Sequence, residues 1–379
     1  MKTEISSLEL HYLLKELQQL ISAKVEQVYQ IAREELIIQF HIPNQGKRFL
    51  RIILGRLLYL ASHKGEIPER PHGFCLFLRR RLKNARVRAI SQPNFERVIE
   101  FAMETKDERY KLAVELFSKG NILLANADSD KIITVLEKRE WKDRSIKPGA
   151  ELKYPEKEFN FLEIERPDLD TFLNKSDKES LVKTLALELG IGGAYAEELC
   201  IMAKVDKTLK PNQLSDKEKD ALHEAIKTLK EKDISPRIIY KDEAKKEVKD
   251  IIPFELDFYN NLYSTEEPDF NAALDKILTQ KVEEKAIEAT EKTAKTKIDK
   301  VNEMLKQQIQ RIEGLEKSEK ENQRKGEIIY ENYPLIEQAI KEILELRKDH
   351  SWKEIKERFK GHKLLKDVNE KTGEITLEI

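Results

Sequence analysis

Apolar residues at helical spacing mark the start of the chain. Between Ser6 and Leu20, leucines stand at positions 10, 13, 14, 17 and 20, which are the three- and four-residue steps of one helix face. Ser6 or Ser7 can cap the first turn, because a serine hydroxyl accepts a hydrogen bond from the free N–H groups of a helix start. The pattern therefore predicts an amphipathic helix.

The segment after this helix has the pattern of a sheet. Short β-branched or alternating runs are separated by turn formers such as Asn44, Gly46 and Gly55, and a single helix at Gly73–Leu82 interrupts them. The expected strands are Val25–Ala32, Leu36–Ile42, Phe49–Leu54, Val87–Ile90, Arg97–Met103, Tyr110–Phe117, Asn121–Ala125 and Ile132–Leu136. We therefore predict an α+β domain over residues 1–170, with a mostly antiparallel sheet flanked by helices.

Helical patterns dominate the remainder. Two helices around Gly190 are predicted within residues 171–215, and a mixed segment, residues 216–269, completes the globular body. From residue 270 to 360 the pattern indicates a long coiled-coil arm. Its seam residues recur at heptad spacing: Ile287, Ala294, Ile298, Val301, Leu305, Ile312 and Leu315. Residues 361–379 are expected to be a short tail, in which Gly373–Ile379 alternates like an edge strand.

Composition narrows the class of protein. The 379 residues suffice for two or three domains, and 37% are charged while the net charge is only -1, so a nucleic-acid surface must be a local patch. Cys75 and Cys200 are far apart, which disfavours a disulfide framework and favours the cytoplasm. No run approaches the about 20 apolar residues of a bilayer span, and no signal peptide is recognised, so no membrane partner is expected.

One segment is strongly basic. Residues 74–88 contain six cations and no acidic residue: Arg79, Arg80, Arg81, Lys83, Arg86 and Arg88. Such a cluster can contact nucleic-acid phosphates, or it can be a solvated helix face in a chain rich in charge. Both alternatives stay open at this point.

A second segment combines glycines with helical flanks. Leu189-Gly190-Ile191-Gly192 with Ala196 fits the helix-hairpin-helix pattern, in which a tight turn exposes backbone N–H groups to a phosphate. Gly190, Gly192 and Gly193 are the candidates for this cradle. The alternative is an ordinary glycine cap between two helices.

Motifs for catalysis are not recognised. The sequence lacks a P-loop and a dinucleotide fingerprint, and its seven histidines have no metal-ligand spacing, so we expect neither an enzyme nor a cofactor nor a metal site. Glu96 and Arg97 stand between a turn and a strand. They could contact a ligand or form an ordinary surface ion pair.

The order of these segments resembles the NFACT family. The matching segments are Pro71–Arg80, Ile90–Gln92 with Glu96–Ile99, Glu115–Leu116 with Gly120–Leu124, Gly149–Pro155, Leu189–Cys200, Asn271–Asp275, and Gly326–Tyr330 with Asn332 and Tyr333. They span nearly the whole chain, and their order and spacing carry the resemblance more than any single motif does.

The resemblance implies a factor in ribosome-associated quality control. Members bind a stalled large ribosomal subunit with peptidyl-tRNA, recruit further tRNA and promote untemplated C-terminal extension of the blocked peptide, while the ribosome performs peptidyl transfer. In the family an Asp-Arg pair and an early acidic residue support tRNA handling. The matching positions are Glu96, Arg97 and Glu9, where glutamate keeps the charge but lengthens the reach.

The family pattern also implies more chain than these 379 residues. Members continue with a return helix and a basic RNA-binding domain, so we expect the seam to pair with a second copy of this chain, giving a homodimer. A coiled-coil scaffold without RNA binding is an alternative. The plan also resembles formamidopyrimidine-type DNA glycosylases, but Lys2 and Thr3 replace their N-terminal proline and glutamate, and two cysteines cannot form their zinc site.

Overall fold

The first helix forms where leucine spacing predicts it. Helix α1 (Ser7–Leu17) begins after Ser6, whose hydroxyl accepts a hydrogen bond from the Glu9 N–H at 3.2 Å. The Glu9 carboxylate in turn accepts one from the Ser6 N–H at 2.8 Å, so two otherwise free backbone donors are satisfied. Leu10 and its helical neighbours enter one hydrophobic core, while Leu8 and Tyr12 enter a second. This helix therefore belongs to both cores.

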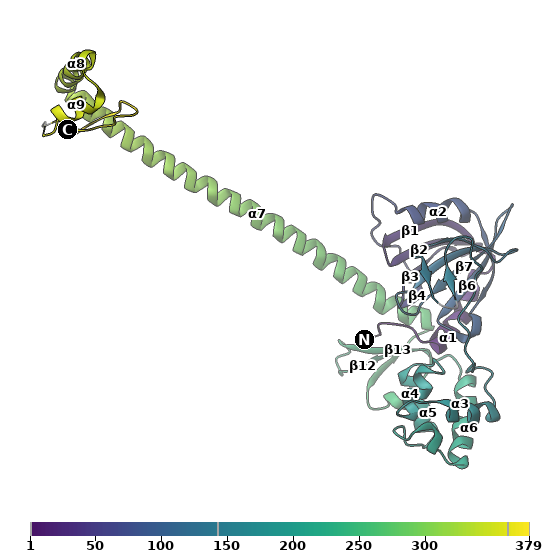
Figure 1. The fold of residues 1–379 in the computed structure, drawn as a ribbon. Coiled ribbons are helices and arrows are strands. Elements are labelled where there is room, and N and C mark those ends of the chain that lie inside the picture. Colours follow the sequence, from purple (N-terminus) through teal and green to yellow (C-terminus); the bar gives the residue numbers. More distant parts are fainter. Residues whose placement is uncertain (1, 142–143, 362–363, 379) are drawn as a thin grey trace. The chain divides into compact units, whose positions relative to one another are not determined.

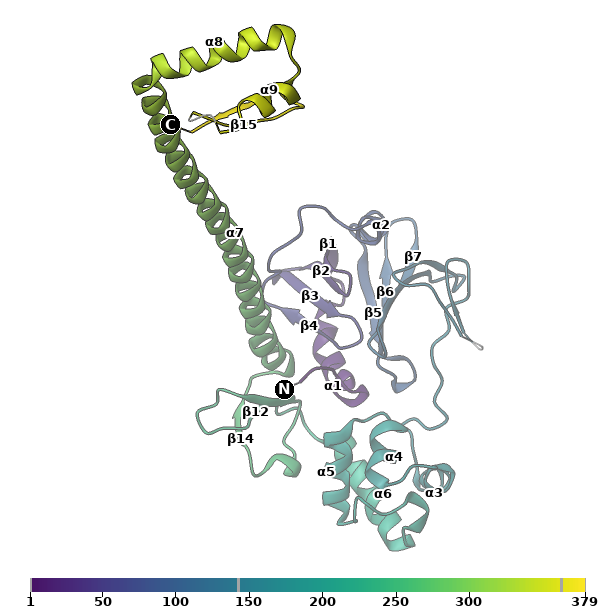
Figure 2. The same ribbon diagram turned by 60° about the vertical axis from the view of Figure 1, so that its left-hand side comes forward.

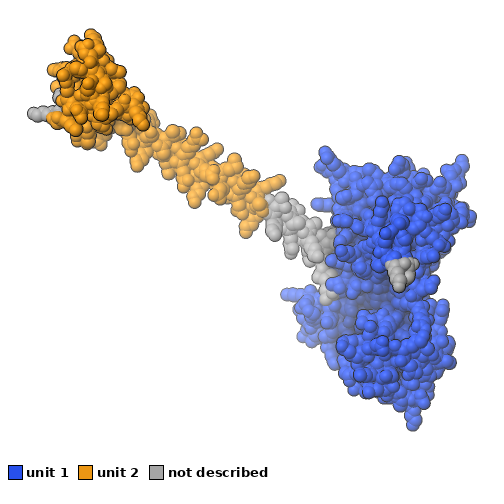
Figure 3. All heavy atoms as spheres, in the orientation of Figure 1, with its two compact units in different colours: residues 1–286 blue, residues 287–379 orange. Residues whose placement is uncertain are grey.

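The computed structural model describes residues 2–141, 144–361 and 364–378, and it describes their side chains except those of residues 280–294. The chain divides into two compact units, residues 1–286 and 287–379, which are coloured separately in Figure 3.

Nine strands form the main sheet of the first unit (Figures 1 and 2). They run in the order β4-β3-β2-β1-β5-β6-β7-β8-β9, and β1 meets β5 through a single pair, Lys24 and Arg86. The sheet is thus two antiparallel meanders joined by a short stretch of pairing where β1 and β5 begin. Their bounds are β1 (Lys24–Ala32), β2 (Glu35–Ile42), β3 (Gly46–Ile53), β4 (Leu57–Ala61), β5 (Arg86–Ser91), β6 (Val98–Glu104), β7 (Arg109–Glu115), β8 (Asn121–Asn126) and β9 (Ile132–Val135).

Eight of these strands were predicted, and β4 was not. All five residues of β4 are buried, so the strand shows no alternation of apolar and polar positions. Its free edge is occupied by Asn271, whose side-chain oxygen accepts from the Leu60 N–H at 2.6 Å and whose amide donates to the Leu60 carbonyl at 2.9 Å. A side chain thus replaces the missing neighbouring strand.

Helix α2 (Gly73–Leu82) has the predicted bounds and buries Cys75, Leu78 and Leu82, while Arg80 and Arg81 are exposed. Beyond the sheet, a short hairpin is formed by β10 (Arg139–Glu140) and β11 (Ser145–Ile146). Four 3₁₀ turns complete the connections: η1 (Gln18–Leu20), η2 (Pro93–Phe95), η3 (Pro211–Gln213) and η4 (Asp257–Tyr259).

Four helices and a small sheet surround the second core. The helices are α3 (Arg166–Lys175), α4 (Leu181–Leu187), α5 (Gly193–Ala203) and α6 (Asp216–Glu231), and the strands are β12 (Arg237–Tyr240), β13 (Val248–Ile252) and β14 (Tyr263–Glu266). Tyr12 of α1 reaches into this core and packs edge-on against Phe254, with ring centroids 4.9 Å apart. The expected pair of helices around Gly190 is confirmed as α4 and α5.

The expected long helix is also confirmed, as α7 (Phe270–Glu331). Its first turn is capped by α1, because the Glu16 carboxylate accepts from the N–H groups of Phe270 and Asn271 at 2.7 Å each. The seam residues Ile298, Val301, Leu305, Ile312 and Leu315 are 53–63% exposed. Ile287 and Ala294 lie outside the described side chains.

The second unit ends in a small α+β module. After α7 follow α8 (Tyr333–Asp349), α9 (Trp352–Arg358), β15 (Leu365–Val368) and β16 (Ile375–Leu377). Ile343, Ile355, Leu365 and Val368 form their shared core. The alternating tail therefore contains a strand, as expected, and that strand pairs with β15.

Candidate functional site

A cleft of about 830 Å³ lies where α1, the β5–β6 turn, the α4–α5 turn and β13 meet. The residues that line it come from segments far apart in the sequence. Among them are Glu9, Glu96, Arg97, Gly190, Gly192 and Gly193, which the sequence singled out for three separate reasons. The fold thus brings half of the predicted site residues into one place.

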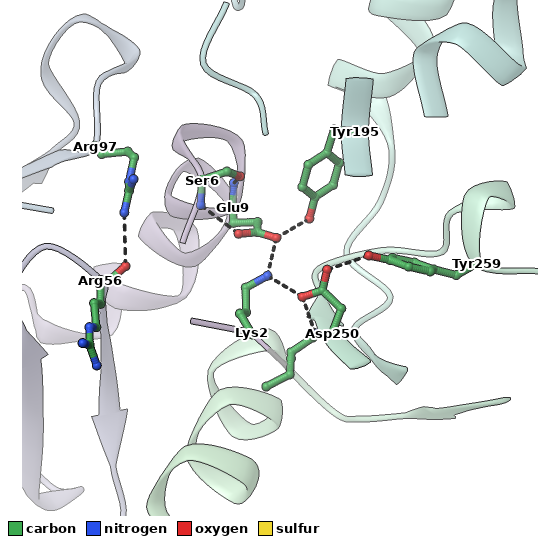
Figure 4. A network of polar contacts seen from close by, with 9 residues as sticks. Lys2, Ser6, Glu9, Arg56, Arg97, Tyr195, Asp250 and Tyr259 are labelled. Carbon is green, nitrogen blue, oxygen red and sulfur yellow. Dashed lines mark hydrogen bonds and ion pairs between the residues drawn. The ribbon is translucent and has the colours of Figure 1, made fainter. Parts of the chain in front are cut away.

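The floor of the cleft is a buried polar network centred on Lys2 (Figure 4). The Lys2 ammonium contacts Glu9 Oε1 at 2.5 Å and Asp250 Oδ1 at 2.9 Å, and the side chains of Lys2 and Glu9 are each only 4% exposed. Tyr195 donates to Glu9 Oε1 at 2.8 Å, and Tyr259 donates to Asp250 Oδ2 at 2.7 Å. This network joins the N-terminal segment, α1, α5, β13 and η4.

The electrostatics of the floor favour the charged lysine and the charged aspartate. Burial alone would lower the pKa of Lys2, but the carboxylates of Glu9 and Asp250 outweigh it and raise that pKa. Burial likewise opposes ionisation of Asp250, yet Lys2 and the Tyr259 hydroxyl lower its pKa overall. Burial, followed by the nearby carboxylates, raises the pKa of Tyr195 and Tyr259, so both phenols remain hydrogen-bond donors.

Glu9 has no free oxygen for a ligand. Its Oε1 atom accepts from Lys2 and Tyr195, and its Oε2 atom accepts from the Ser6 N–H that opens α1. This carboxylate therefore holds the cleft together and orients the first turn of α1.

Glu96 and Arg97 are placed at the rim and do not pair with one another. Glu96 lies 3.3 Å from the Lys157 ammonium, whereas Arg97 contacts the Glu4 carboxylate at 2.8 Å. Arg97 also donates to the carbonyls of Gly55 and Arg56 at 3.4 Å, and its Nε atom is buried without a partner. The Glu4 side chain is 60% exposed. Arg97 is therefore held by two backbone carbonyls and by one carboxylate that is open to solvent.

The α4–α5 turn forms the opposite wall. Gly190 and Gly192 have φ angles of +72° and +93°, which favour glycine, and a Cβ on Gly190 would collide with the Lys157 ammonium. Gly193 begins α5 and is exposed, with no heavy atom within 4 Å of the position of a Cβ. The first N–H groups of a helix have no intrahelical acceptor, so this wall presents backbone donors to the cleft.

Several lining residues were missed by the sequence reasoning. Lys2, Lys157 and Asp250 belong to no motif, and each stands in a charged or amphipathic stretch that shows nothing unusual. Tyr195 lies within the helix-hairpin-helix segment but was not singled out as a site residue. Lys2 and Asp250 are 248 residues apart, so no local pattern could have paired them.

The six cations of the basic segment do not reach this cleft. Arg79, Arg80 and Lys83 line a separate shallow groove of about 670 Å³ beside β1, together with Glu26, Gln27 and Leu76. The structure thus places the two sets of predicted residues on different surfaces of the same unit.

Most of these cations already have partners. Arg79 donates to the Val28 carbonyl at 2.6 Å and Arg86 to the Ser22 carbonyl at 3.3 Å. Arg81 pairs with Glu108 at 3.3 Å, and Arg88 pairs with Glu104 at 2.5 Å. Arg80 and Lys83 are exposed, and neither has a hydrogen-bond or ion-pair partner in the described part of the chain.

The described residues contain no group of three or more histidine, cysteine, aspartate or glutamate side chains that could hold a metal ion. None of their helices combines the length and the apolar character that crossing a bilayer requires.

Solved structures define the class of fold. The fibrinogen binding protein from Staphylococcus aureus aligns with 71% of this chain and 97% of its own, with a TM-score of 0.57 and 17% identity. The N-terminal part of the fibronectin/fibrinogen-binding protein from Streptococcus suis aligns with 73% and 100%, with a TM-score of 0.57 and 18% identity. At these identities the likeness concerns the fold alone.

Sequence comparison defines the family. The model of the NFACT N-terminal and middle domains matches residues 6–376, and the chain therefore belongs to the NFACT family. The archaeal Rqc2 homolog aRqcH of Methanocaldococcus jannaschii is 33% identical over the whole chain and 58% of its own length.

Two eukaryotic relatives are more distant. The ribosome quality control complex subunit NEMF of Homo sapiens is 26% identical over 76% of this chain and 29% of its own. Subunit 2 of the same complex in Saccharomyces cerevisiae is 29% identical over 50% and 17%. The chain thus spans little more than half of the archaeal relative and less of the others. Both eukaryotic relatives are named as subunits of a ribosome quality control complex.

Proposed function

We propose that this chain is a ribosome quality control factor that binds stalled large ribosomal subunits and tRNA, and that it promotes untemplated C-terminal tailing of the nascent chain. The observation that carries the proposal is the cleft. Glu9, Arg97 and the Gly190–Gly193 turn come from three distant segments, yet all line one hollow of about 830 Å³. A hollow of this size lies within the range of about 300–1,000 Å³ that holds small-molecule ligands, so it has room for part of an RNA strand.

Arg97 is the residue most suited to contact RNA. Its guanidinium is fixed by the carbonyls of Gly55 and Arg56 and faces Glu4, whose carboxylate is 60% exposed. A phosphate can displace that carboxylate without leaving a buried charge, because Glu4 then returns to water. Glu96 lies in the same rim and is held by Lys157, so it can accept hydrogen bonds from a base or a ribose.

The glycine wall and the basic groove contribute phosphate contacts. At the α4–α5 turn, exposed Gly193 lets a phosphate approach the first N–H groups of α5. Near α2, Arg80 and Lys83 supply cations that no carboxylate neutralises within the described residues. These contacts position RNA without reading its sequence.

The chain acts in this proposal as a binding factor and not as an enzyme. Bond formation in the nascent peptide belongs to the ribosome, and the contacts of this chain bring a tRNA and the large subunit together in the cytoplasm. The chain spans 58% of its archaeal relative, and the proposed RNA contacts are those of these 379 residues.

The test is co-sedimentation with purified large ribosomal subunits, with and without bound peptidyl-tRNA, over a series of salt concentrations. The expected result is retention that increases with tRNA and declines with salt. Arg97→Gln should weaken binding by about ten- to a hundredfold, since a charge-assisted contact contributes about 1.5–3 kcal/mol. Lys183→Gln, a change on α4 at a residue paired with Glu179, serves as the matched control.

Loss of binding in the Arg97 variant alone would support the cleft as the RNA site. Equal retention of the Arg97→Gln and Lys183→Gln variants would remove the cleft from the proposal. Absence of all RNA binding by the unaltered chain would favour the scaffold alternative.

A homodimer through α7 is the second part of the proposal. The seam residues Val301, Leu305 and Ile312 are more than half exposed, and an apolar stripe at heptad spacing is stabilised by a second helix. Sedimentation velocity at micromolar concentrations should show a dimer that Leu305→Glu dissociates. A monomer at all concentrations would exclude this pairing between copies of the chain.

A further inference from the structure

A large aromatic side chain stands exposed at the end of the β10–β11 hairpin. Trp141 follows β10 and leaves 48% of its surface open to solvent. The backbone N–H of Trp141 donates to the Arg144 carbonyl at 2.9 Å. This bond continues the hairpin pairing of Arg139 with Ile146 and of Glu140 with Ser145. The tryptophan ring offers a large flat apolar surface, and such rings favour stacked contacts with other planar groups.

The base of this hairpin is firmly anchored. The Arg144 guanidinium pairs with Glu115, whose side chain is fully buried at the end of β7, and its Nε atom donates to the Lys153 carbonyl at 2.7 Å. Arg139 donates to the Gly120 carbonyl at 2.7 Å. A buried ion pair is costly to form and costlier to break, so Trp141 sits on a base that resists displacement.

The same anchors tie the hairpin to segments that continue into the cleft. Glu115 precedes Phe117 by two residues, and Lys153 precedes Pro155 by two residues, and both Phe117 and Pro155 line the cleft. Both tethers of Arg144 therefore attach to segments that lead into the cleft wall.

The surroundings of the ring are cationic. Among the described residues 138–141 and 144–147, four are lysine or arginine and one is acidic. The Arg144 guanidinium lies 6.0 Å from the centre of the Trp141 ring, and Lys138 is exposed without a hydrogen-bond or ion-pair partner among the described residues. An aromatic face flanked by cations is the arrangement that binds an unpaired nucleobase and its phosphate, whatever the base.

We propose that Trp141 is a stacking platform for an unpaired nucleobase of RNA, next to the cleft. This inference rests on the proposed RNA binding and adds a second contact to it: one nucleotide enters the cleft, and a neighbouring base lies on the open face of Trp141. Lys138 contacts the phosphate between them. The base can belong to tRNA or to ribosomal RNA, since stacking does not distinguish the two.

The chain has only two tryptophans, Trp141 and Trp352, which allows a direct test. In a Trp352→Phe variant of the full chain, fluorescence reports Trp141 alone, and a stacked base should quench it upon addition of tRNA. Trp141→Leu keeps apolar bulk but lacks an aromatic face, and it should weaken RNA binding by about tenfold, whereas Trp141→Tyr should bind nearly as well as the unaltered chain. Thermal unfolding of both variants should stay unchanged, because the ring is exposed.

The same fluorescence measurement is repeated with large ribosomal subunits that carry no tRNA. Quenching by one of the two RNAs and not by the other identifies the source of the stacked base. RNA that binds without quenching Trp141, or equal affinity of the Leu and Tyr variants, overturns the platform and leaves the proposed function intact. If the unaltered chain binds neither RNA, the proposed function and the platform fail together.

Discussion

The floor of the cleft and the basic segment at α2 both carry cations, but these cations meet different surroundings. Lys2 is almost completely buried and contacts two carboxylates, Glu9 and Asp250. Arg80 and Lys83 are exposed, with no carboxylate partner in the part of the chain that the structure describes. A buried charge must be paired because the desolvation penalty is large, whereas an exposed one keeps its hydration and remains available to a ligand.

This difference distinguishes charged residues that hold the cleft together from charged residues that can contact RNA. The sequence placed Glu9 and the arginines in one set of RNA-binding candidates, yet Glu9 has both oxygens engaged inside the protein. We therefore expect changes on the cleft floor to alter folding first, and changes at Arg80 and Lys83 to alter RNA binding only.

Lys2→Met should have the largest effect. Removing the ammonium leaves the carboxylates of Glu9 and Asp250 facing each other in a buried site, and loss of one partner of a buried pair costs about 3–5 kcal/mol. Denaturant unfolding of the full chain measures the change. Lys249→Met is the matched control, because Lys249 also lines the cleft but is exposed, and it should change the free energy of unfolding by less than about 0.5 kcal/mol. Similar losses in both variants would contradict a special role for Lys2.

Gly190→Ala should have the next largest effect. Gly190 has a φ angle of +72°, where an L side chain costs about 1–2 kcal/mol, and the added methyl group would displace the Lys157 ammonium from beside Glu96. Gly193→Ala is the control, since Gly193 has open space and begins a helix, where alanine is favourable. If thermal unfolding fell equally in both variants, strain at Gly190 would not be the cause.

The pH dependence of stability tests the charges of the cleft floor at acidic and at basic pH. Asp250 has a pKa below its ordinary 3.8, so its contribution is present above that value and is lost as the pH falls through the lowered pKa. Lys2 has a pKa above 10.5, so its contribution is complete below that value and is lost as the pH rises through the raised pKa. The difference in unfolding temperature between the unaltered chain and Lys2→Met should therefore be constant near neutral pH and shrink at both extremes. A difference that is independent of pH would mean that charge is not involved.

Changes in the basic segment should have the smallest effect on stability. Arg80→Ala with Lys83→Ala should leave unfolding unchanged, yet it should lower the slope of log affinity for RNA against log salt by about 2, one for each lost phosphate contact. Arg81→Ala with Arg88→Ala should lower the slope less, because Glu108 and Glu104 already neutralise those arginines. Filter binding over a salt series distinguishes the two pairs. Equal slopes would show that these ion pairs do not decide which cation meets RNA.

Much of the local structure was predictable from the sequence. Eight strands of the main sheet, the helices α1, α2, α4 and α5, and the long α7 follow from alternation or helical spacing, which depend on neighbouring residues alone. Strand β4 was missed because burial on both faces removes the alternation. The small module after α7 was expected only as the end of the coiled-coil arm and a tail. Its core joins Ile343 and Ile355 to Leu365 and Val368, which no local pattern indicates.

For the site, the sequence determined which residue types stand in which order, and their resemblance to a family selected Glu9, Glu96, Arg97 and the glycine turn. It could not determine that these residues share one cleft, nor that Lys2 pairs with Asp250 across 248 residues. Burial and pairing depend on which segments fold against each other. Only the tertiary structure therefore decided which charges hold the cleft together and which remain free to meet RNA.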